Sequence, residues 1–387
     1  MRASAFKDLG RFFLSAALFC GPLAHAESKV LKVGVLLSDT GDLKATAIEM
    51  RRAVQLAARL FNEKHAGKAE IQFVFADDAS RVQGASTKAE WLVRDQKVDA
   101  VIGPSFLAGA SVSAPLFATA GIPVIVPLAR TQKWGETSNT RFLQIEESRM
   151  GAALAGFARR SLSAKNAALV DDLSSDSSKA FNDGFKTAFD SKKTPVKDRL
   201  GYVSAANEAP QLLAALSKLK VDVVSLPSTQ WDAARVFLGT AAAAGVSAVF
   251  LGSSAWSPSG PAIGHFFVDI FSVTLPASRD FVEIFHQDDA KDLKNKAPDP
   301  SRLAALSFEA VSIFGQAFDR AGLQTKAPLQ KALDGPAFFE GVSGKLRFRS
   351  DGTPERDILV LETTKSGIPR YRETLSSAAP KPVVPSK

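Results

Sequence analysis

The chain has 387 residues, and its 48 Lys and Arg outnumber its 40 Asp and Glu, which gives a net charge of +8. This length is sufficient for two domains of ordinary size, each with its own buried core. The basic residues are spread along the sequence with no run of five like charges, so the charge indicates solubility and argues against a nucleic-acid partner.

Residues 1–26 have the pattern of an export signal peptide. Three basic residues precede or flank the apolar run FFLSAALFCGPLA, and Ala24-His25-Ala26 provides small residues for cleavage. The apolar run is too short to span a bilayer, which argues against a membrane anchor. Cys20 leaves a lipid anchor as an alternative, although a bulky Phe19 precedes it where such sites have a small residue. Cleavage after Ala26 would remove the single cysteine, so we expect no disulfide bond.

Expected strands and helices alternate from residue 30 to residue 127. Apolar, β-rich runs predict strands at residues 30–37, 70–76, 98–103 and 123–127, and helical spacing of apolar residues predicts helices between them. Strands separated by helices are joined by right-handed crossovers and form a parallel sheet. This part of the chain therefore predicts one parallel α/β unit.

A second series of the same kind begins near Met150. Its expected strands are residues 166–170, 200–203, 221–226 and 247–252, again with helices between them. A long helical region is expected from Asp280 to Leu333, interrupted at APDPS. The pattern predicts a second sheet of similar construction.

The chain ends with two β-like runs and a tail. An Asp-Gly turn at Asp351-Gly352 joins the two runs into an expected hairpin. Residues 372–387 end in SSAAPKPVVPSK, which has the composition of a disordered tail, and we expect no structure there.

Several stretches of the sequence occur in the order and spacing of one known family. They include LKVGVLLSDTG, KVDAVIGP, AGIPVIVP and FFEGVSGKLRFRSDGTPERDILV. In these stretches the chain resembles the periplasmic solute-binding proteins of the branched-chain amino acid type, which feed ABC importers. The resemblance implies an α/β fold of two Rossmann-like lobes with parallel sheets and a three-crossover hinge, the type I fold of periplasmic binding proteins. It implies a first lobe of residues 29–146 and 276–342 and a second lobe of residues 147–275 and 343–371.

The same resemblance implies a function. We expect a periplasmic protein that captures a small organic solute, amino acid-like or carboxylate, in a cleft between the lobes and delivers it to an ABC permease complex in the inner membrane. We expect a monomer with no cofactor, no metal and no nucleic-acid partner. An exported sensor or cell-envelope assembly factor on the same scaffold stays open as the alternative, because a fold does not determine a function.

The stretch Ala100–Leu116 departs from the family at the start of a predicted helix. The first N–H groups of a helix have no partner within it, and family members add a serine there to hold the ligand carboxylate. The resemblance aligns this serine with Leu107, which Ala108 follows. An apolar side chain here either closes the carboxylate pocket or admits a less polar solute, so it argues against an ordinary branched-chain amino acid.

A second departure follows the strand at residues 123–127. Small residues and a threonine of the family correspond to Leu128, Ala129 and Arg130, so a hydroxyl is lost and a guanidinium is added. Arg130 would pair with an anionic group of the solute. The alternative is an arginine in solvent or on a surface carboxylate.

The second lobe departs from the family as well. Two tyrosines that cover the ligand align near Asp176 and Thr229, and the acid that meets the ligand ammonium aligns near Ser254. Asp171, Asp172 or Asp176 could replace this acid, and N-capping of the next helix is the alternative.

Two tryptophans complete the expected site. Trp231 and Trp256 would stack on a flat or apolar solute, or instead fill gaps between elements. The expected ligand-binding residues are Leu107, Ala108, Leu128, Arg130, Asp176, Thr229, Ser254 and Trp256.

The sequence offers little for catalysis. Its four histidines show no metal-ligand spacing, and it contains no Gly-x-Ser-x-Gly elbow and no phosphate-binding Lys loop. We therefore expect a binding protein and not an enzyme.

Overall fold

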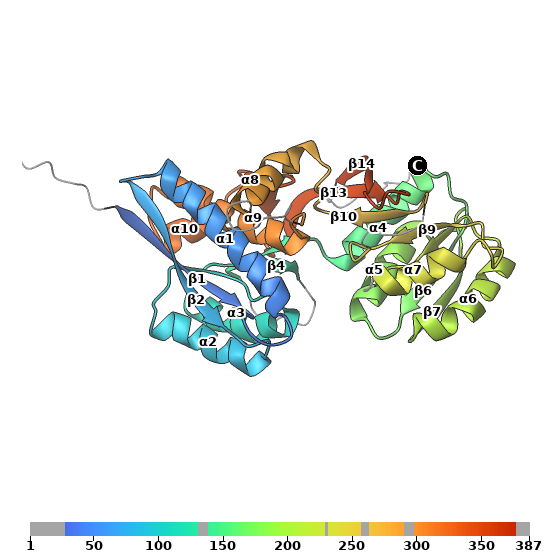
Figure 1. Cartoon of the computed structure of the whole chain (residues 1–387), viewed down its shortest axis with the longest axis horizontal. Helices are drawn as coiled ribbons and strands as arrows, with labels where there is room; N and C mark the ends of the chain where they lie inside the picture. Colours follow the sequence, from blue (N-terminus) through green and yellow to red (C-terminus); the bar gives the residue numbers. More distant parts are fainter. Residues whose placement is uncertain (1–27, 131–137, 229–230, 257–262, 290–297, 377–387) are drawn as a thin grey trace, which may run out of the picture.

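The computed structural model describes residues 28–130, 138–228, 231–256, 263–289 and 298–376, which form two α/β lobes side by side (Figure 1). Each lobe has one sheet with helices on both faces. This confirms the predicted α/β fold of two lobes. The predicted signal peptide, residues 1–26, lies outside the described residues, and so do residues 377–387 of the predicted tail.

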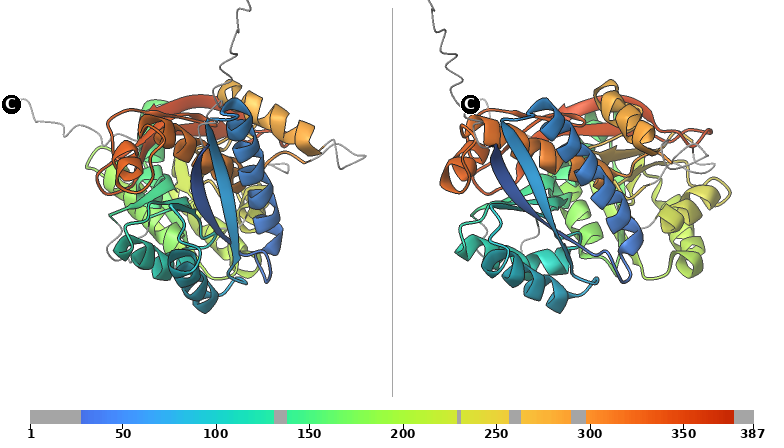
Figure 2. Two further views of the ribbon diagram at one scale, coloured as in Figure 1. Left: turned by 90° about the vertical axis from the view of Figure 1, so that its left-hand side faces the viewer. Right: turned by 60° about the vertical axis from the view of Figure 1, so that its left-hand side comes forward.

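The sheet of the first lobe has five parallel strands in the order β2-β1-β3-β4-β5. They are β1 (Lys29–Leu37), β2 (Ala69–Asp77), β3 (Ala100–Ile102), β4 (Val124–Ala129) and β5 (Thr140–Gln144). One face is covered by α1 (Lys44–Lys64) and α9 (Arg302–Arg320), and the other by α2 (Val82–Arg94) and α3 (Leu107–Thr119) (Figure 2). Central strands covered on both faces are buried on both sides, which is why they read as apolar runs.

The sheet of the second lobe has nine strands in the order β11-β12-β13-β10-β9-β8-β6-β7, with β14 paired to β13. The parallel strands are β6 (Ala167–Asp172), β7 (Val196–Tyr202), β8 (Val223–Ser225), β9 (Val249–Gly252) and β10 (Phe266–Asp269). The antiparallel strands are β11 (Phe339–Gly341), β12 (Gly344–Phe348), β13 (Pro354–Glu362) and β14 (Arg370–Ser376). One face is covered by α4 (Glu147–Arg160) and α5 (Asp176–Phe189), and the other by α6 (Ala205–Leu219) and α7 (Trp231–Thr240).

Three shorter helical segments complete the described chain. They are the 3₁₀ turn η1 (Pro276–Ser278), α8 (Arg279–Asp289) and α10 (Ala327–Leu333). Phe281 and Phe285 of α8 pack in one cluster with Ala53 and Leu56 of α1, so α8 lies on the first lobe. The predicted helical region has a second interruption after α9, where Gly322 takes a positive φ of 63°.

One buried ion pair lies where the chain passes between the lobes. Arg356 of β13 and Glu309 of α9 have side chains that are 2% and 0% exposed, and Nη1 and Oε1 are 2.6 Å apart. Arg356 also donates to the carbonyl of Leu143 in β5 and to the hydroxyl of Ser343 in the β11–β12 turn. The Ser343 hydroxyl donates to the carbonyl of Ile270, just after β10. This pair, called the hinge pair below, therefore ties together all three connections between the lobes.

The predicted hairpin at Asp351-Gly352 is confirmed. β12 and β13 are antiparallel, Gly352 takes a φ of 78°, and the Asp351 carboxylate accepts the N–H of Thr353 at 3.0 Å. A Cβ at Gly352 would come 2.2 Å from the carbonyl oxygen of Thr140, so this turn also approaches β5 too closely for any side chain.

Three strands of the structure, β5, β10 and β14, were not predicted, and β10 has only four residues. β5 was not predicted because its sequence, TRFLQ, mixes polar and apolar residues. Its Arg141 is nevertheless buried, and the guanidinium donates to two backbone carbonyls. β14 contradicts part of the predicted tail, because residues 372–376 pair with β13. Its polar side chains belong to an exposed edge strand and not to a disordered segment.

The exact lobe limits stay a prediction. The expected boundary between residues 342 and 343 falls in the turn between β11 and β12, which are hydrogen bonded to each other. One hydrophobic cluster extends from Val54 of α1 to Phe181 of α5, so the two lobes share buried contacts beside the hinge pair.

Candidate functional site

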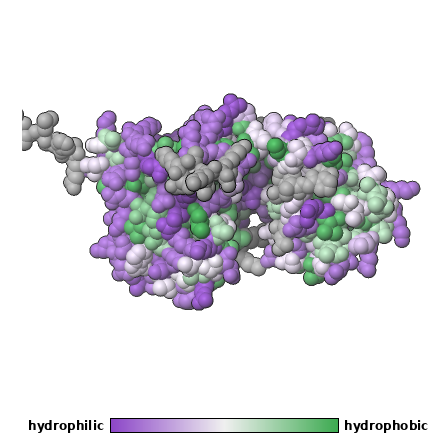
Figure 3. Space-filling view, in the orientation of Figure 1, coloured by the Kyte–Doolittle hydropathy of each residue, from purple (hydrophilic) through white to green (hydrophobic). Residues whose placement is uncertain are grey.

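A cavity of about 680 Å³ lies between the two lobes. The first lobe contributes the starts of α1 and α9, and the second lobe contributes the ends of β9 and β10. Its lining includes Thr46, Glu49, Ser254, Trp256, Asp269 and Arg302. The surface of the molecule is hollowed between the lobes (Figure 3). Helices start where parallel strands end, so the cavity lies at the sheet edge where open α/β folds bind ligands.

Arg302 joins the two lobes across the wall of this cavity. It is the first residue of α9, which Ser301 caps by accepting the N–H of Ala304. Its Nη1 donates to the carbonyl of Ser254 at 2.8 Å and lies 3.1 and 3.2 Å from the two carboxylate oxygens of Asp269. The arginine belongs to a helix of the first lobe, whereas both acceptors lie at strand ends of the second.

A second and much smaller cavity, of about 10 Å³, lies behind this wall. Arg302, Asp269 and Ser254 line both cavities, and Glu147 lines the small one alone. A volume of this size holds about one water molecule. The three shared residues therefore lie between the small cavity and the large one.

The two carboxyl groups of the small cavity have perturbed pKa values. Burial raises the pKa of Glu147 to about 7, with nearby Asp269 acting in the same direction and Arg302 in the opposite one. Burial also raises the pKa of Asp269, although Arg302 and the N–H groups of Ile270 and Phe271 favour its charged form. Perturbed carboxyl groups in a concave site are typical of functional positions.

The predicted residues of the α3 start lie at the facing edge of the first lobe. Leu107 begins α3 and its side chain is 38% exposed, and Ala108 is also exposed. Phe106 is the N-cap and provides no side-chain hydrogen bond. The first N–H groups of α3 are thus not capped by a side chain, as expected for a carboxylate site, but Leu107 and Ala108 line neither of the two cavities described above.

Arg130 has a protein partner in the structure. Its Nη1 donates to the carbonyl of Asp351 at 3.2 Å and lies 3.6 Å from the carboxylate of the same residue. This partner lies on the β12–β13 turn, and both side chains are partly exposed. Leu128, two residues earlier at the end of β4, packs against the hydrophobic cluster of α2 and α3. The surface pairing considered as the alternative for Arg130 is therefore present, and a role in solute binding stays a prediction.

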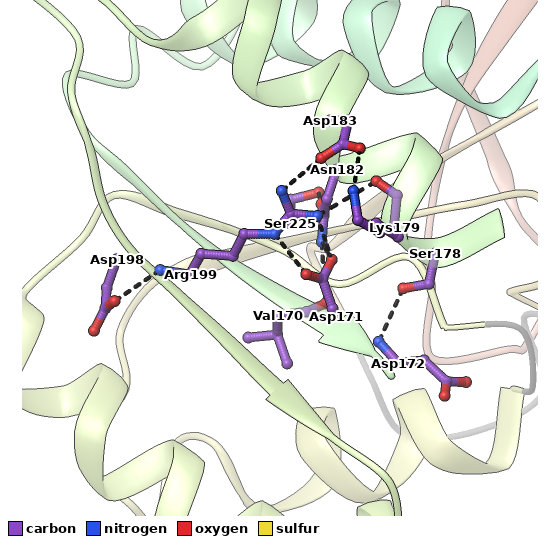
Figure 4. A network of polar contacts seen from close by, with 10 residues as sticks. All are labelled: Val170, Asp171, Asp172, Ser178, Lys179, Asn182, Asp183, Asp198, Arg199 and Ser225. Atoms are coloured by element: carbon purple, nitrogen blue, oxygen red, sulfur yellow. Dashed lines mark hydrogen bonds and ion pairs between the residues drawn. The ribbon is translucent and has the colours of Figure 1, made fainter. Parts of the chain in front are cut away.

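The candidate acids of the second lobe hold local structure. Asp171 accepts hydrogen bonds from Arg199 at 2.5 Å and from Asn182 at 2.8 Å, within the polar network of Figure 4. Asp172 accepts from the N–H of Ser174 at 3.1 Å. Asp171 is therefore satisfied inside the lobe, and whether Asp171, Asp172 or Asp176 replaces the missing acid stays a prediction.

Asp176 is the first residue of α5, and it is exposed. The N-cap is its neighbour Ser175, whose hydroxyl accepts the N–H of Ser178 at 3.3 Å. Helix capping thus belongs to a serine, and a contact of Asp176 with solute stays a prediction.

The last three predicted residues have different outcomes. Ser254 lines both cavities, and its carbonyl accepts from Arg302. Trp256 is 2% exposed, its ring lies over Gly252, and its Nε1 donates to the carbonyl of Leu226 at 3.2 Å. The ring thus packs in the second lobe at the border of the large cavity, which it also lines, and a contact of Trp256 with solute stays a prediction. Thr229 lies outside the described residues.

Glu147, Asp269 and Arg302 were missed by the reading of the sequence. Asp269 directly follows three apolar residues of β10, and a charged residue at the end of a parallel strand is a usable signal. Glu147 and Arg302 start helices, a position that many charged residues occupy without any ligand, so the sequence marks them only weakly.

The described residues lack two kinds of functional feature. None of the helices within these ranges is both long and apolar enough to cross a membrane. Within the same ranges, no group of three or more His, Cys, Asp or Glu side chains is arranged to hold a metal ion.

The sequence matches the family model of periplasmic binding proteins over residues 30–367. At the level of single sequences, no curated protein matches the chain.

The fold is similar to that of solved substrate-binding proteins. An ABC transporter substrate-binding protein from Sphaerobacter thermophilus is 18% identical with a TM-score of 0.77, over 90% of this chain and 98% of that chain. LivJ from Streptococcus pneumoniae, in complex with isoleucine, is 21% identical with a TM-score of 0.71, over 90% and 100%. A solute-binding protein from R. palustris, in complex with benzoate, is 21% identical with a TM-score of 0.67, over 89% and 96%. At these identities the similarity concerns the fold.

Proposed function

Because the chain belongs to the family of periplasmic binding proteins, we propose that it captures a small organic solute, amino acid-like or carboxylate, between its two lobes. The cavity of about 680 Å³, lined from both lobes, carries this proposal. The proposal also includes export by residues 1–26 and delivery of the solute to an ABC permease complex in the inner membrane. In it the protein is a monomer and not an enzyme.

The composition of the cavity wall supports a small organic ligand. Phe271, Leu303 and Ile368 provide apolar surface, Arg302 provides a positive charge, and the negative charges come from Glu49, Asp269 and Asp299. Concave sites of several hundred Å³ with a few polar groups on an apolar wall are typical of small-molecule binding.

The start of α3, whose residues Leu107 and Ala108 lie outside the lining of the cavity of about 680 Å³, supports a carboxylate on the solute. Its first N–H groups lack a side-chain cap, and a helix N-terminus favours negative charge. Two proteins of similar fold hold isoleucine and benzoate, and the carboxylate is the only charged group that these two ligands have in common. The exposed Leu107 beside this helix start favours a solute with an apolar body.

A thermal-shift screen of the full chain tests the proposal. The library should contain amino acids, aromatic and aliphatic acids, and the corresponding amides. A solute that binds only the folded protein adds about 2.7 kcal/mol of stability at one hundred times its Kd, so it should raise the melting temperature clearly.

If no compound of the library raises the melting temperature, the result would contradict solute capture. It would instead favour the alternative of an exported sensor or cell-envelope assembly factor, which pull-down of envelope proteins would then test.

A further inference from the structure

The wall between the two cavities is formed across the lobes. Arg302 of the first lobe bonds to Asp269 and to the carbonyl of Ser254 in the second lobe, and these three residues line both cavities. Breaking their bonds would connect the small cavity to the large one and admit water. The three residues Arg302, Asp269 and Ser254 are called the latch below.

Glu147 lines the small cavity and not the large one, and within the described residues its carboxyl group accepts no hydrogen bond. The small cavity is lined by two carboxyl groups, those of Glu147 and Asp269, and by one guanidinium, that of Arg302. If both carboxyl groups are ionised, one negative charge stays uncompensated in a space with room for about one water molecule. A neutral Glu147 removes this excess charge.

We propose that the latch is sensitive to protonation: a neutral Glu147 keeps Arg302 on the second lobe, and an ionised Glu147 favours the separation of the latch and the entry of water. The proposal requires only the two-lobed fold, so it stands or falls independently of the solute.

The direction of the pH dependence follows from the pKa of Glu147. In the latched arrangement burial raises this pKa to about 7. When the latch opens, hydration of the carboxyl group would return the pKa to its ordinary value of 4.5. The latched arrangement therefore binds the proton more tightly. Its stability is fully present below pH 4.5 and is lost as the pH rises through about 7.

Distance measurements between the lobes test the proposal without any ligand. Spin labels on cysteines at exposed positions of the two lobes, E90C in α2 and Q211C in α6, report the interlobe distance in the full chain carrying C20S. We expect the distance distribution to change between pH 5.5 and pH 8.5, with a midpoint near 7. E147Q, the neutral isostere, should keep the pH 5.5 distribution at both pH values.

Two further variants sharpen the test. E146Q makes the same charge change one residue earlier, at a residue that lines neither cavity, and it should titrate like the parent. R302M removes the guanidinium of the latch and should show the pH 8.5 distribution throughout. A parent distance that does not change with pH, or an E147Q variant that titrates like the parent, would overturn the proposal.

Discussion

Glu309 and Arg356 show how much one pair of side chains can contribute to the architecture. Both charges are fully buried, so removing one of them leaves the other without compensation in the interior. We expect Arg356→Met to lower the free energy of unfolding by about 3–5 kcal/mol, measured by urea denaturation.

The matched comparison is the double variant E309M/R356M. It removes both charges and replaces them with apolar side chains, so it should be more stable than either single variant. A single variant within about 1 kcal/mol of the parent, the size of a surface pair, would show that the pair is not buried in solution.

Arg130 provides a second prediction at this scale. Its pair with Asp351 is partly exposed, so Arg130→Ala should change the free energy of unfolding by less than about 1 kcal/mol. If the guanidinium also meets an anionic solute, the affinity for that solute should fall about tenfold or more, measured by calorimetric titration.

Arg235→Ala is the control for this prediction, because Arg235 forms a more exposed pair with Asp232 on α7, 3.2 Å apart. It should leave both stability and affinity unchanged. An R130A variant with the affinity of the parent would assign Arg130 to the surface pair alone.

The sequence located the facing edges of the lobes better than the groups that act there. Leu107, Arg130 and Ser254 do follow strands at the predicted places, because the end of an apolar run is a local signal. The latch was not predicted, since Ser254, Asp269 and Arg302 meet only through the association of two lobes.

At the scale of elements, α4 and α5 approach each other more closely than side chains allow. A Cβ on Gly184 would lie 1.8 Å from the carbonyl oxygen of Ser148, and one on Gly151 would lie 2.0 Å from that of Phe181. We expect Gly184→Ala to lower the free energy of unfolding by about 1–3 kcal/mol, because the helices must separate.

Gly239→Ala is the matched control on α7. Gly239 is exposed, and a Cβ there has no atom within 4 Å. Alanine favours the helix over glycine, so this change should stabilise by about 0.5–1 kcal/mol. Thermal unfolding of both variants checks the pair of predictions, and equal effects would contradict the close helix contact.

Most elements were predictable because their patterns are local. The alternation of apolar runs and amphipathic segments indicated both parallel series and their helices. β5 and β14 were not predicted, because their polar residues become strand residues only through pairing with β4 and β13. β10 was not predicted either, because its four residues are too short a run to indicate a strand.

At the scale of the whole molecule, a solute that contacts both lobes favours the arrangement in which both contacts are made. We expect the radius of gyration, measured by small-angle X-ray scattering, to decrease when a stabilising solute is added. A solute that raises the melting temperature without changing the radius of gyration would show that this cavity binds without closure.

The hinge pair has a consequence for how such a scaffold diversifies. Glu309 and Arg356 line neither cavity, although they hold together the three segments that connect the lobes. Evolution can therefore exchange the residues that surround the guest molecule while the axis of rotation is preserved. A single mechanical framework can in this way acquire new chemical preferences through a few substitutions, without a new way of moving.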